Sequence, residues 1–248
     1  MAFFKLTLAY DGTNYVGWQR QASGTSVQGL IEGALAELEG RDVTVHGAGR
    51  TDAGVHALGQ VASFSLERQI DAGVLARALN ARLPADVRVL SAAAVPEAFH
   101  ARFSAIRKRY RYRFSDAAVL SPFERSYAWH VSGALNVGVM DEAARFLEGR
   151  HDFAGFASAG GTTRSTERTM SSARVRREPD ALVIFEISGD GFLRHMVRAI
   201  AGTLADIGHG RRPRESMDHV LASRDRAQAG PTAPARGLFL VEVEYADL

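Results

Sequence analysis

The chain has 248 residues, of which 46% are hydrophobic and 23% charged, and this composition is typical of a globular protein with a sizeable core. It contains no cysteine, which excludes disulfides, thiolate nucleophiles and cysteine zinc sites. Thirty basic residues against 28 acidic ones leave a formal charge of only +2, so net charge alone does not indicate a partner. With no apolar run near the roughly 18 residues that span a bilayer and no signal-peptide pattern, we expect a cytoplasmic protein that does not bind a membrane.

Strands and helices alternate along the first hundred residues. A strand over residues 3–10 ends in the turn Asp11-Gly12. A helix follows over residues 27–38, which Thr25 and Gln28 begin as a capping box and Gly40 ends. The next expected elements are strands over 43–46 and 60–67, a helix over 74–83 that ends at Pro84, and a strand over 87–95.

A similar alternation begins again after His100. In chain order we expect a strand over 106–114, a helix over 137–147, a hairpin of 172–177 and 181–188, helices over 192–207 and 214–222, and a strand over 238–245. This pattern predicts an α+β protein with largely antiparallel sheets and helices on one face. We expect two domains, residues 1–104 and 105–248, and mobile loops at 160–163 and 230–234.

Basic side chains are concentrated in the strand predicted over residues 106–114. One face would carry Lys108, Tyr110, Tyr112 and Phe114, and the other Arg107, Arg109, Arg111 and Arg113. Arginines that neutralise phosphates and aromatic rings that stack on bases would together make an RNA-binding platform. The simpler alternative is a strand with aromatic core residues and a solvated basic face.

The most unusual segment is residues 46–57, His-Gly-Ala-Gly-Arg-Thr-Asp-Ala-Gly-Val-His-Ala. Gly47 and Gly49 begin the G-x-G-x-x-G pattern of dinucleotide-binding loops, but Asp52 stands where the third glycine belongs. A carboxylate there would repel a pyrophosphate, so we exclude a nucleotide cofactor.

What remains is an aspartate in a glycine-rich loop. Glycines permit unusual backbone conformations and close approach of a ligand, and the guanidinium of Arg50 would favour an ionised Asp52. An ionised carboxylate is what a nucleophile or general base requires. An aspartate that only caps a turn is the ordinary alternative. The histidines lack metal-ligand spacing, so we expect no metal site and interpret His56 and His195 as structural.

Two segments, GRTDAGVHALGQV and the opening LAYDGTNYVGWQRQ, resemble the TruA family of tRNA pseudouridine synthases. The resemblance extends in the same order through FHARFSAIRKRYRYRF, HDFAGFA, GDGFLRHMVRAIAGTL and PARGLFLVEV, and so covers essentially the whole chain. One departure lies in AGGTTRSTER, residues 159–168, where many members carry a cysteine-containing version.

The resemblance implies that the protein isomerises uridine to pseudouridine in the anticodon stem-loop of tRNA, around positions 38 to 40. It also implies a cytoplasmic homodimer without cofactor or metal, and a pseudouridine synthase-like fold whose two halves form a central RNA-binding cleft. The family's catalytic aspartate matches Asp52, and the arginine associated with displacing the target base matches Arg50. The active-site tyrosine matches Tyr110, and Arg198 resembles the arginine proposed to pair with the catalytic carboxylate.

The residues suit this reaction, in which the N-glycosidic bond breaks and uracil C5 joins the same sugar carbon. Asp52 would attack that carbon, add to the ring or remove a sugar proton, and the sequence leaves these three roles open. Each requires an ionised carboxylate beside a base taken out of its stack. One rival interpretation is a non-catalytic RNA-binding protein. Another is an aspartate-dependent hydrolase, for which no second carboxylate stands out near the loop.

Overall fold

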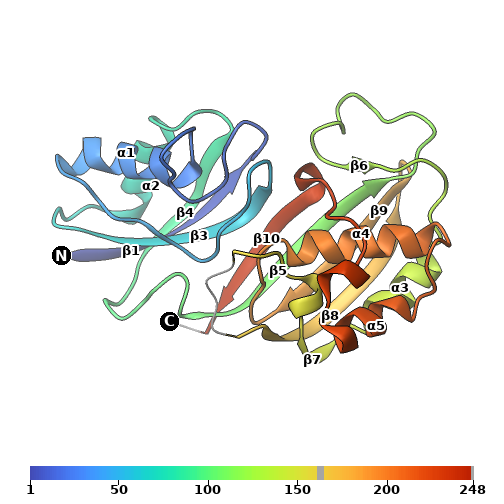
Figure 1. Cartoon of the computed structure of the whole chain (residues 1–248). Helices are drawn as coiled ribbons and strands as arrows, with labels where there is room; N and C mark the ends of the chain where they lie inside the picture. The colour runs from blue at the N-terminus through green and yellow to red at the C-terminus, as the bar shows by residue number, and fades with distance from the viewer. Residues whose placement is uncertain (161–164, 247–248) are drawn as a thin grey trace. The chain divides into compact units, whose positions relative to one another are not determined.

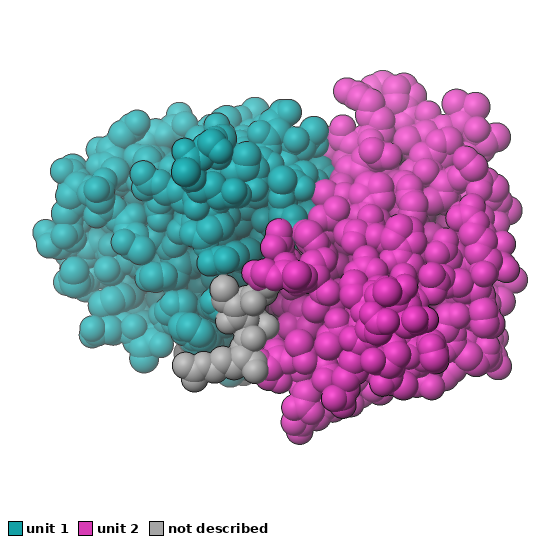
Figure 2. Space-filling view, in the orientation of Figure 1, with its two compact units in different colours: residues 1–106, 239–248 teal, residues 107–238 magenta. Residues whose placement is uncertain are grey.

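The computed structural model describes residues 1–160 and 165–246, and these form two compact units (Figure 2). Unit 1 comprises residues 1–106 and 239–248, and unit 2 comprises residues 107–238. The last strand therefore belongs with the first unit, not with the second half in which the sequence placed it. Of the loop expected to be mobile at 160–163, residues 161–163 lie outside the described residues.

Unit 1 is a mainly antiparallel sheet in the order β4-β1-β3-β10 with two helices (Figure 1). Strand β10 runs parallel to β3, with Phe239 opposite His56, and the short strand β2 pairs with β3 off this path. The elements are β1 (Ala2–Tyr10), α1 (Val27–Glu39), β2 (His46–Gly47), β3 (His56–Leu66), α2 (Ala72–Asn80), β4 (Val87–Ala94) and β10 (Leu238–Tyr245), which belongs to the unit from Phe239 onward.

Local sequence explains most of these elements. Alternate residues of β1 are buried, which is the period of a strand with one face on a core. Helix α1 ends at Gly40, whose φ of 81° is left-handed, as its sequence predicts. Its N-cap is Ser26, whose side chain accepts from the N–H of Gly29, so the prediction of Thr25 as the cap is wrong by one residue. Helix α2 begins at Ala72 because Asp71 caps it.

The strands of unit 2 pair antiparallel in the order β5-β9-β8-β7, and three α-helices of the unit pack together (Figure 1). Strand β6 runs parallel to β5. The elements are β5 (Ala105–Ser115), which belongs to the unit from Arg107 onward, β6 (Trp129–His130), α3 (Val137–Arg145), β7 (Gly149–Asp152), β8 (Glu167–Glu178), β9 (Leu182–Gly189), α4 (Met196–Gly208) and α5 (Ser216–Ser223). The hairpin predicted around Pro179 is confirmed, as is the α+β class with largely antiparallel sheets.

Helix α4 is almost wholly buried and packs directly on the segment 229–234. A Cβ added at Gly202 would lie 1.7 Å from the carbonyl oxygen of Pro231, so only glycine permits this contact. The hydroxyl of Thr203 accepts from the N–H of Gly230 at 2.8 Å. The helix begins at Met196 and not at residue 192, because His195 before it has a left-handed φ of 60°.

Within residues 1–160 and 165–246, no helix combines the length and the apolar character needed to cross a bilayer.

Candidate active-site loop

The segment that carries Asp52 folds as a tight turn in unit 1. The N–H of Val55 donates to the carbonyl of Asp52 at 3.1 Å, which closes a four-residue turn. Gly54 has a φ of 76°, the left-handed conformation required at the third position of a type II turn. Asp52 is half-buried, and Arg50, two residues earlier, is exposed. Of the two site residues predicted in this segment, Arg50 is therefore open to solvent and Asp52 is partly open to it.

The opening segment of the chain lies against this turn. Gly17 and Asp52 form an isolated antiparallel backbone bridge. The N–H of Trp18 donates to the carbonyl of Thr51 at 3.0 Å, and the N–H of Gly54 donates to the carbonyl of Tyr15 at 3.4 Å. The two segments that resemble the TruA family most strongly thus form one hydrogen-bonded assembly.

Two glycines of the opening segment make this approach possible. Gly17 has a φ of 108°, and an added Cβ would lie 2.5 Å from the carbonyl oxygen of Thr51. At Gly12 an added Cβ would lie 2.0 Å from the carbonyl oxygen of Val55. Real Cβ atoms do not approach backbone this closely, so contact with the loop requires glycine at positions 12 and 17.

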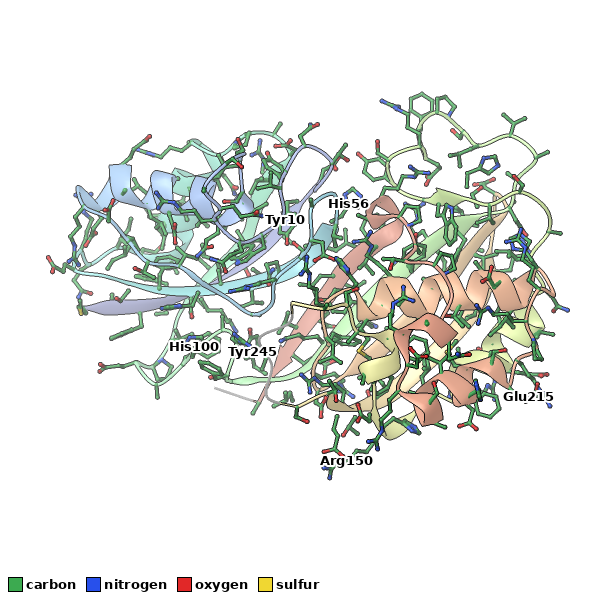
Figure 3. All side chains as sticks on the ribbon, viewed as in Figure 1. Tyr10, His56, His100, Arg150, Glu215 and Tyr245 are labelled. Carbon is green, nitrogen blue, oxygen red and sulfur yellow. The ribbon has the colours of Figure 1, made fainter. Side chains whose placement is uncertain are left out.

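His56 supports the same assembly from the start of β3 (Figure 3). Its Nδ1 accepts from the N–H of Gly12 at 3.1 Å and lies 3.1 Å from Oδ1 of Asp11. The ring stacks on Phe239 with centroids 4.6 Å apart. The buried His56 ring is thus held by contacts with three residues of unit 1. In the described residues no three His, Asp or Glu side chains gather as metal ligands.

Two buried polar residues beside the loop were not singled out by the sequence analysis. Tyr10 is 4% exposed and Gln60 is fully buried, and both belong to hydrogen bonds that reach residues 49 and 51. The available signal was Gln60 itself, because a long polar side chain within a largely apolar strand needs a hydrogen-bond partner when it is buried.

Tyr110 and Arg198, the other predicted site residues, both lie in unit 2. Tyr110, on β5, is buried and makes an edge-on contact with Phe192, with ring centroids 4.8 Å apart. Arg198, on α4, is half-buried, and its Nε donates to the carbonyl of Ala233 at 2.8 Å while the N–H of Ala233 donates back to the carbonyl of Arg198. These bonds link α4 to the segment 229–234.

The aromatic face of β5 is not an exposed stacking platform, because Tyr110, Tyr112 and Phe114 are all buried, as the simpler interpretation of this strand expects. Tyr112 and Phe114 are fully buried, so they are core residues and not a surface for bases. The hydroxyl of Tyr112 donates to the carbonyl of Pro234 at 2.8 Å. Burial raises the pKa of Tyr112, and the nearby guanidinium groups of Arg198 and Arg236 oppose this shift in part.

The basic face of β5 is partly neutralised by acidic neighbours. Arg111 pairs with Glu186 at 2.8 Å and Arg113 with Glu124 at 2.7 Å. Burial acts to raise the pKa of Glu186, but hydrogen bonds from Arg111 and Arg176 outweigh it and hold that pKa below its usual range. Arg107, at the start of the strand, is exposed. The arginines of this strand therefore differ in exposure, since Arg111 and Arg113 are half-buried.

Comparison with known proteins matches residues 7–104 and 143–246 to a family described as tRNA pseudouridine synthase. Proteins named tRNA pseudouridine synthase A match over almost their entire length. That of Moorella thermoacetica is 48% identical and that of Afipia carboxidovorans 47%, each with 99% of this chain aligned to 100% of the relative. That of Myxococcus xanthus is 47% identical over 100% of this chain and 93% of its own. The chain belongs to the tRNA pseudouridine synthase family.

Proposed function

We propose that the protein isomerises uridine to pseudouridine in the anticodon stem-loop of tRNA, at positions 38 to 40. The observation that carries this proposal is the loop of Asp52, held by the opening segment in a chain that belongs to this family. A protein that only binds RNA has no use for a carboxylate placed at an accessible turn, because an anion repels phosphate.

The chemistry requires no external reagent. The bond from N1 of uracil to C1′ of the ribose breaks, and a bond from C5 to C1′ forms. The hydrogen at C5 leaves as a proton, and N1 gains one. Asp52 starts this rearrangement by attacking C1′, adding to the ring or removing a sugar proton, and each role needs the base out of its stack.

We assign the remaining roles as the family resemblance implies. Arg50, exposed beside Asp52, helps to displace the target base from the stem-loop. Tyr110 contacts the extracted uracil, since a phenol ring offers both a stacking face and a polar hydroxyl. Arg198 orients the Asp52 carboxylate, a task that suits a planar guanidinium with paired donors.

The test is tritium release from unmodified tRNA labelled at C5 of uracil. Isomerisation must release this hydrogen to water, and we expect release that stops once the uridines at positions 38 to 40 are converted. A control tRNA with cytidine at those three positions should release none. Tight binding without release would indicate a non-catalytic RNA-binding protein, and free uracil would indicate a hydrolase.

We further propose that the protein acts in the cytoplasm as a homodimer, without metal or nucleotide cofactor. Sedimentation at several protein concentrations measures the assembly state, and a species of twice the 26.8 kDa chain mass is expected. Tritium release should persist after exhaustive dialysis against EDTA. Loss of activity that added metal restores would contradict this part of the proposal.

A further inference from the structure

A chain of buried hydrogen bonds lies beneath the Asp52 loop. The hydroxyls of Tyr10 and Thr51 are 2.8 Å apart. The side-chain amide of Gln60 donates to the carbonyl of Gly49 at 2.9 Å and to the hydroxyl of Tyr10 at 3.4 Å. Tyr10 is 4% exposed, Thr51 is 6% exposed and Gln60 is not exposed at all. The two bonds of the Tyr10 hydroxyl are therefore shielded from water, and the bond from Gln60 to Gly49 is partly buried.

The polar atoms of Gln60 are fully used. Its two amide hydrogens go to Gly49 and Tyr10, and its Oε1 accepts from the N–H of Val61 at 3.1 Å. Burial raises the pKa of Tyr10 to about 12, so its hydroxyl is protonated at any pH at which an enzyme of this kind works. Removal of one partner would leave another buried polar group unsatisfied, which is unfavourable.

These hydrogen bonds hold the Asp52 loop at two residues, Gly49 and Thr51. Gly49 is held through its carbonyl and Thr51 through its hydroxyl, whereas Arg50 is exposed and Asp52 is half-buried. The anchored positions therefore fix the backbone from which the two functional side chains project.

We propose that Tyr10 and Gln60 are positioning residues for catalysis, acting through Thr51 and Gly49 on the placement of Asp52. This inference rests on the proposed function, in which Asp52 is the reacting carboxylate. A catalytic group must be held to about 0.5 Å, and a displacement of about 1 Å lowers turnover by about 100-fold. Neither Tyr10 nor Gln60 needs to touch the substrate for this effect.

The test separates positioning from general stabilisation of unit 1. Thr51→Val keeps the side-chain shape and removes the hydroxyl, and Tyr10→Phe removes the other hydroxyl of the pair. Thr51→Ser keeps a hydroxyl and is the rescue variant. Tyr245→Phe is the matched control, because its hydroxyl also donates to a carbonyl of unit 1, that of Ala101, at 2.7 Å, and it lies away from Tyr10 (Figure 3).

Single-turnover tritium release and tRNA affinity are measured for each variant. We expect Thr51→Val and Tyr10→Phe to lower the rate by about 10- to 100-fold with tRNA affinity within about twofold of wild type. Thr51→Ser should recover to within about threefold, and Tyr245→Phe should retain the wild-type rate. The double variant Tyr10→Phe, Thr51→Val should be no slower than the slower single variant, because both changes remove the same bond.

A second measurement keeps the inference testable if the wild-type protein does not isomerise uridine. Amide hydrogen exchange of Trp18, whose N–H is bonded to the carbonyl of Thr51, reports the order of the loop directly. Tyr10→Phe should accelerate this exchange and Tyr245→Phe should not. Faster exchange with an inactive wild type would reject the proposed function and retain the anchoring of the loop.

Three outcomes would overturn the inference. The first is a rate in Tyr10→Phe and Thr51→Val equal to that of the wild type. The second is a loss in Thr51→Ser as large as in Thr51→Val. The third is unchanged Trp18 exchange in both hydroxyl-deleted variants.

Discussion

Gly17 and Asp52 are joined by an isolated antiparallel backbone bridge, outside any named strand. The contact places the opening segment of the chain directly against the loop proposed to react. It exists because Gly17 lacks a Cβ and adopts a φ of 108°. The position of the Asp52 backbone therefore depends on a residue far from it in the sequence.

Gly17→Ala should disrupt this contact. The added methyl would lie 2.5 Å from the carbonyl oxygen of Thr51, and left-handed backbone is strained for alanine, so we expect a loss of about 1–3 kcal/mol in the free energy of unfolding. Urea unfolding measures it, and tritium release should fall as well. Gly33→Ala is the control, since no atom lies within 4 Å of its added Cβ in helix α1, and it should stabilise by about 0.5–1 kcal/mol. Equal effects of the two changes would contradict the role of Gly17.

Asp52→Asn should abolish tritium release while tRNA affinity stays nearly constant. The substitution keeps the size of the side chain and removes the ionised oxygen that each proposed reaction requires. Exposed Asp42→Asn, in the same unit, should behave as wild type. Turnover of Asp52→Asn above about a tenth of the wild-type value would remove Asp52 from the catalytic role.

Arg198 is predicted to act as a unit with Asp52. Arg198→Lys retains the charge but loses the planar pair of donors, so it should still be slowed, and Arg198→Ala should be slower. The double variant Asp52→Asn, Arg198→Ala should be scarcely slower than Asp52→Asn alone. The rate measured is single-turnover tritium release.

A matched control separates this role from the tethering of the segment 229–234. Arg226 also holds that segment, through the carbonyl of Gly230 at 3.0 Å and the hydroxyl of Thr232 at 2.8 Å. Arg226→Ala should retain most of the wild-type rate. If Arg226→Ala is slowed as much as Arg198→Ala, then Arg198 acts by tethering the segment 229–234 and not on the Asp52 carboxylate.

The arginines of β5 should differ in their effect on tRNA binding. Arg107→Ala should weaken binding and reduce the slope of log affinity against log salt by about 1, because exposed arginines neutralise phosphates. Arg111→Ala should change both much less, since Arg111 is engaged by Glu186 at 2.8 Å. Filter binding at several salt concentrations gives both quantities. A larger effect of Arg111 would show that it leaves Glu186 for the RNA backbone.

Asp116 should make stability depend on pH. Hydrogen bonds from Arg177 at 2.9 and 2.8 Å hold the pKa of Asp116 below its ordinary value, and the Asp116 side chain is only 4% exposed. A carboxyl with a lower pKa in the folded state stabilises the fold above its unfolded pKa of about 3.9, and this stabilisation is lost as the pH falls through the lower folded value. Asp116→Asn should therefore cost about 1–3 kcal/mol at pH 7 and progressively less below about pH 4.

Urea unfolding at pH 7 and at pH 3 measures this difference in the cost of Asp116→Asn. Glu167→Gln is the control, because Glu167 and Arg150 form a pair whose side chains are 54% and 71% exposed. Water screens such a pair, so its removal should change the free energy of unfolding by less than about 1 kcal/mol at either pH. A constant cost of Asp116→Asn from pH 7 to pH 3 would contradict the linkage.

Elements with strong local signals could be predicted from the sequence. The end of α1 at Gly40 and the hairpin of β8 and β9 depend on residues that are neighbours along the chain. The loop residues Arg50 and Asp52 were singled out as candidates in the same way, because a glycine-rich string of that length is conspicuous without any structure. Such signals are local, so composition and spacing carry them.

Only the tertiary structure decided which polar and aromatic side chains are buried. The sequence left open whether Tyr112 and Phe114 face RNA or the core, and the structure places both in the core of unit 2. The sequence analysis did not single out Tyr10 and Gln60, which lie on different strands and both form hydrogen bonds with the Asp52 loop. Alternation along a strand defines two faces but does not tell which face another element covers. That choice depends on strand pairing between distant segments, such as β10 on β3, and only the folded chain fixes it.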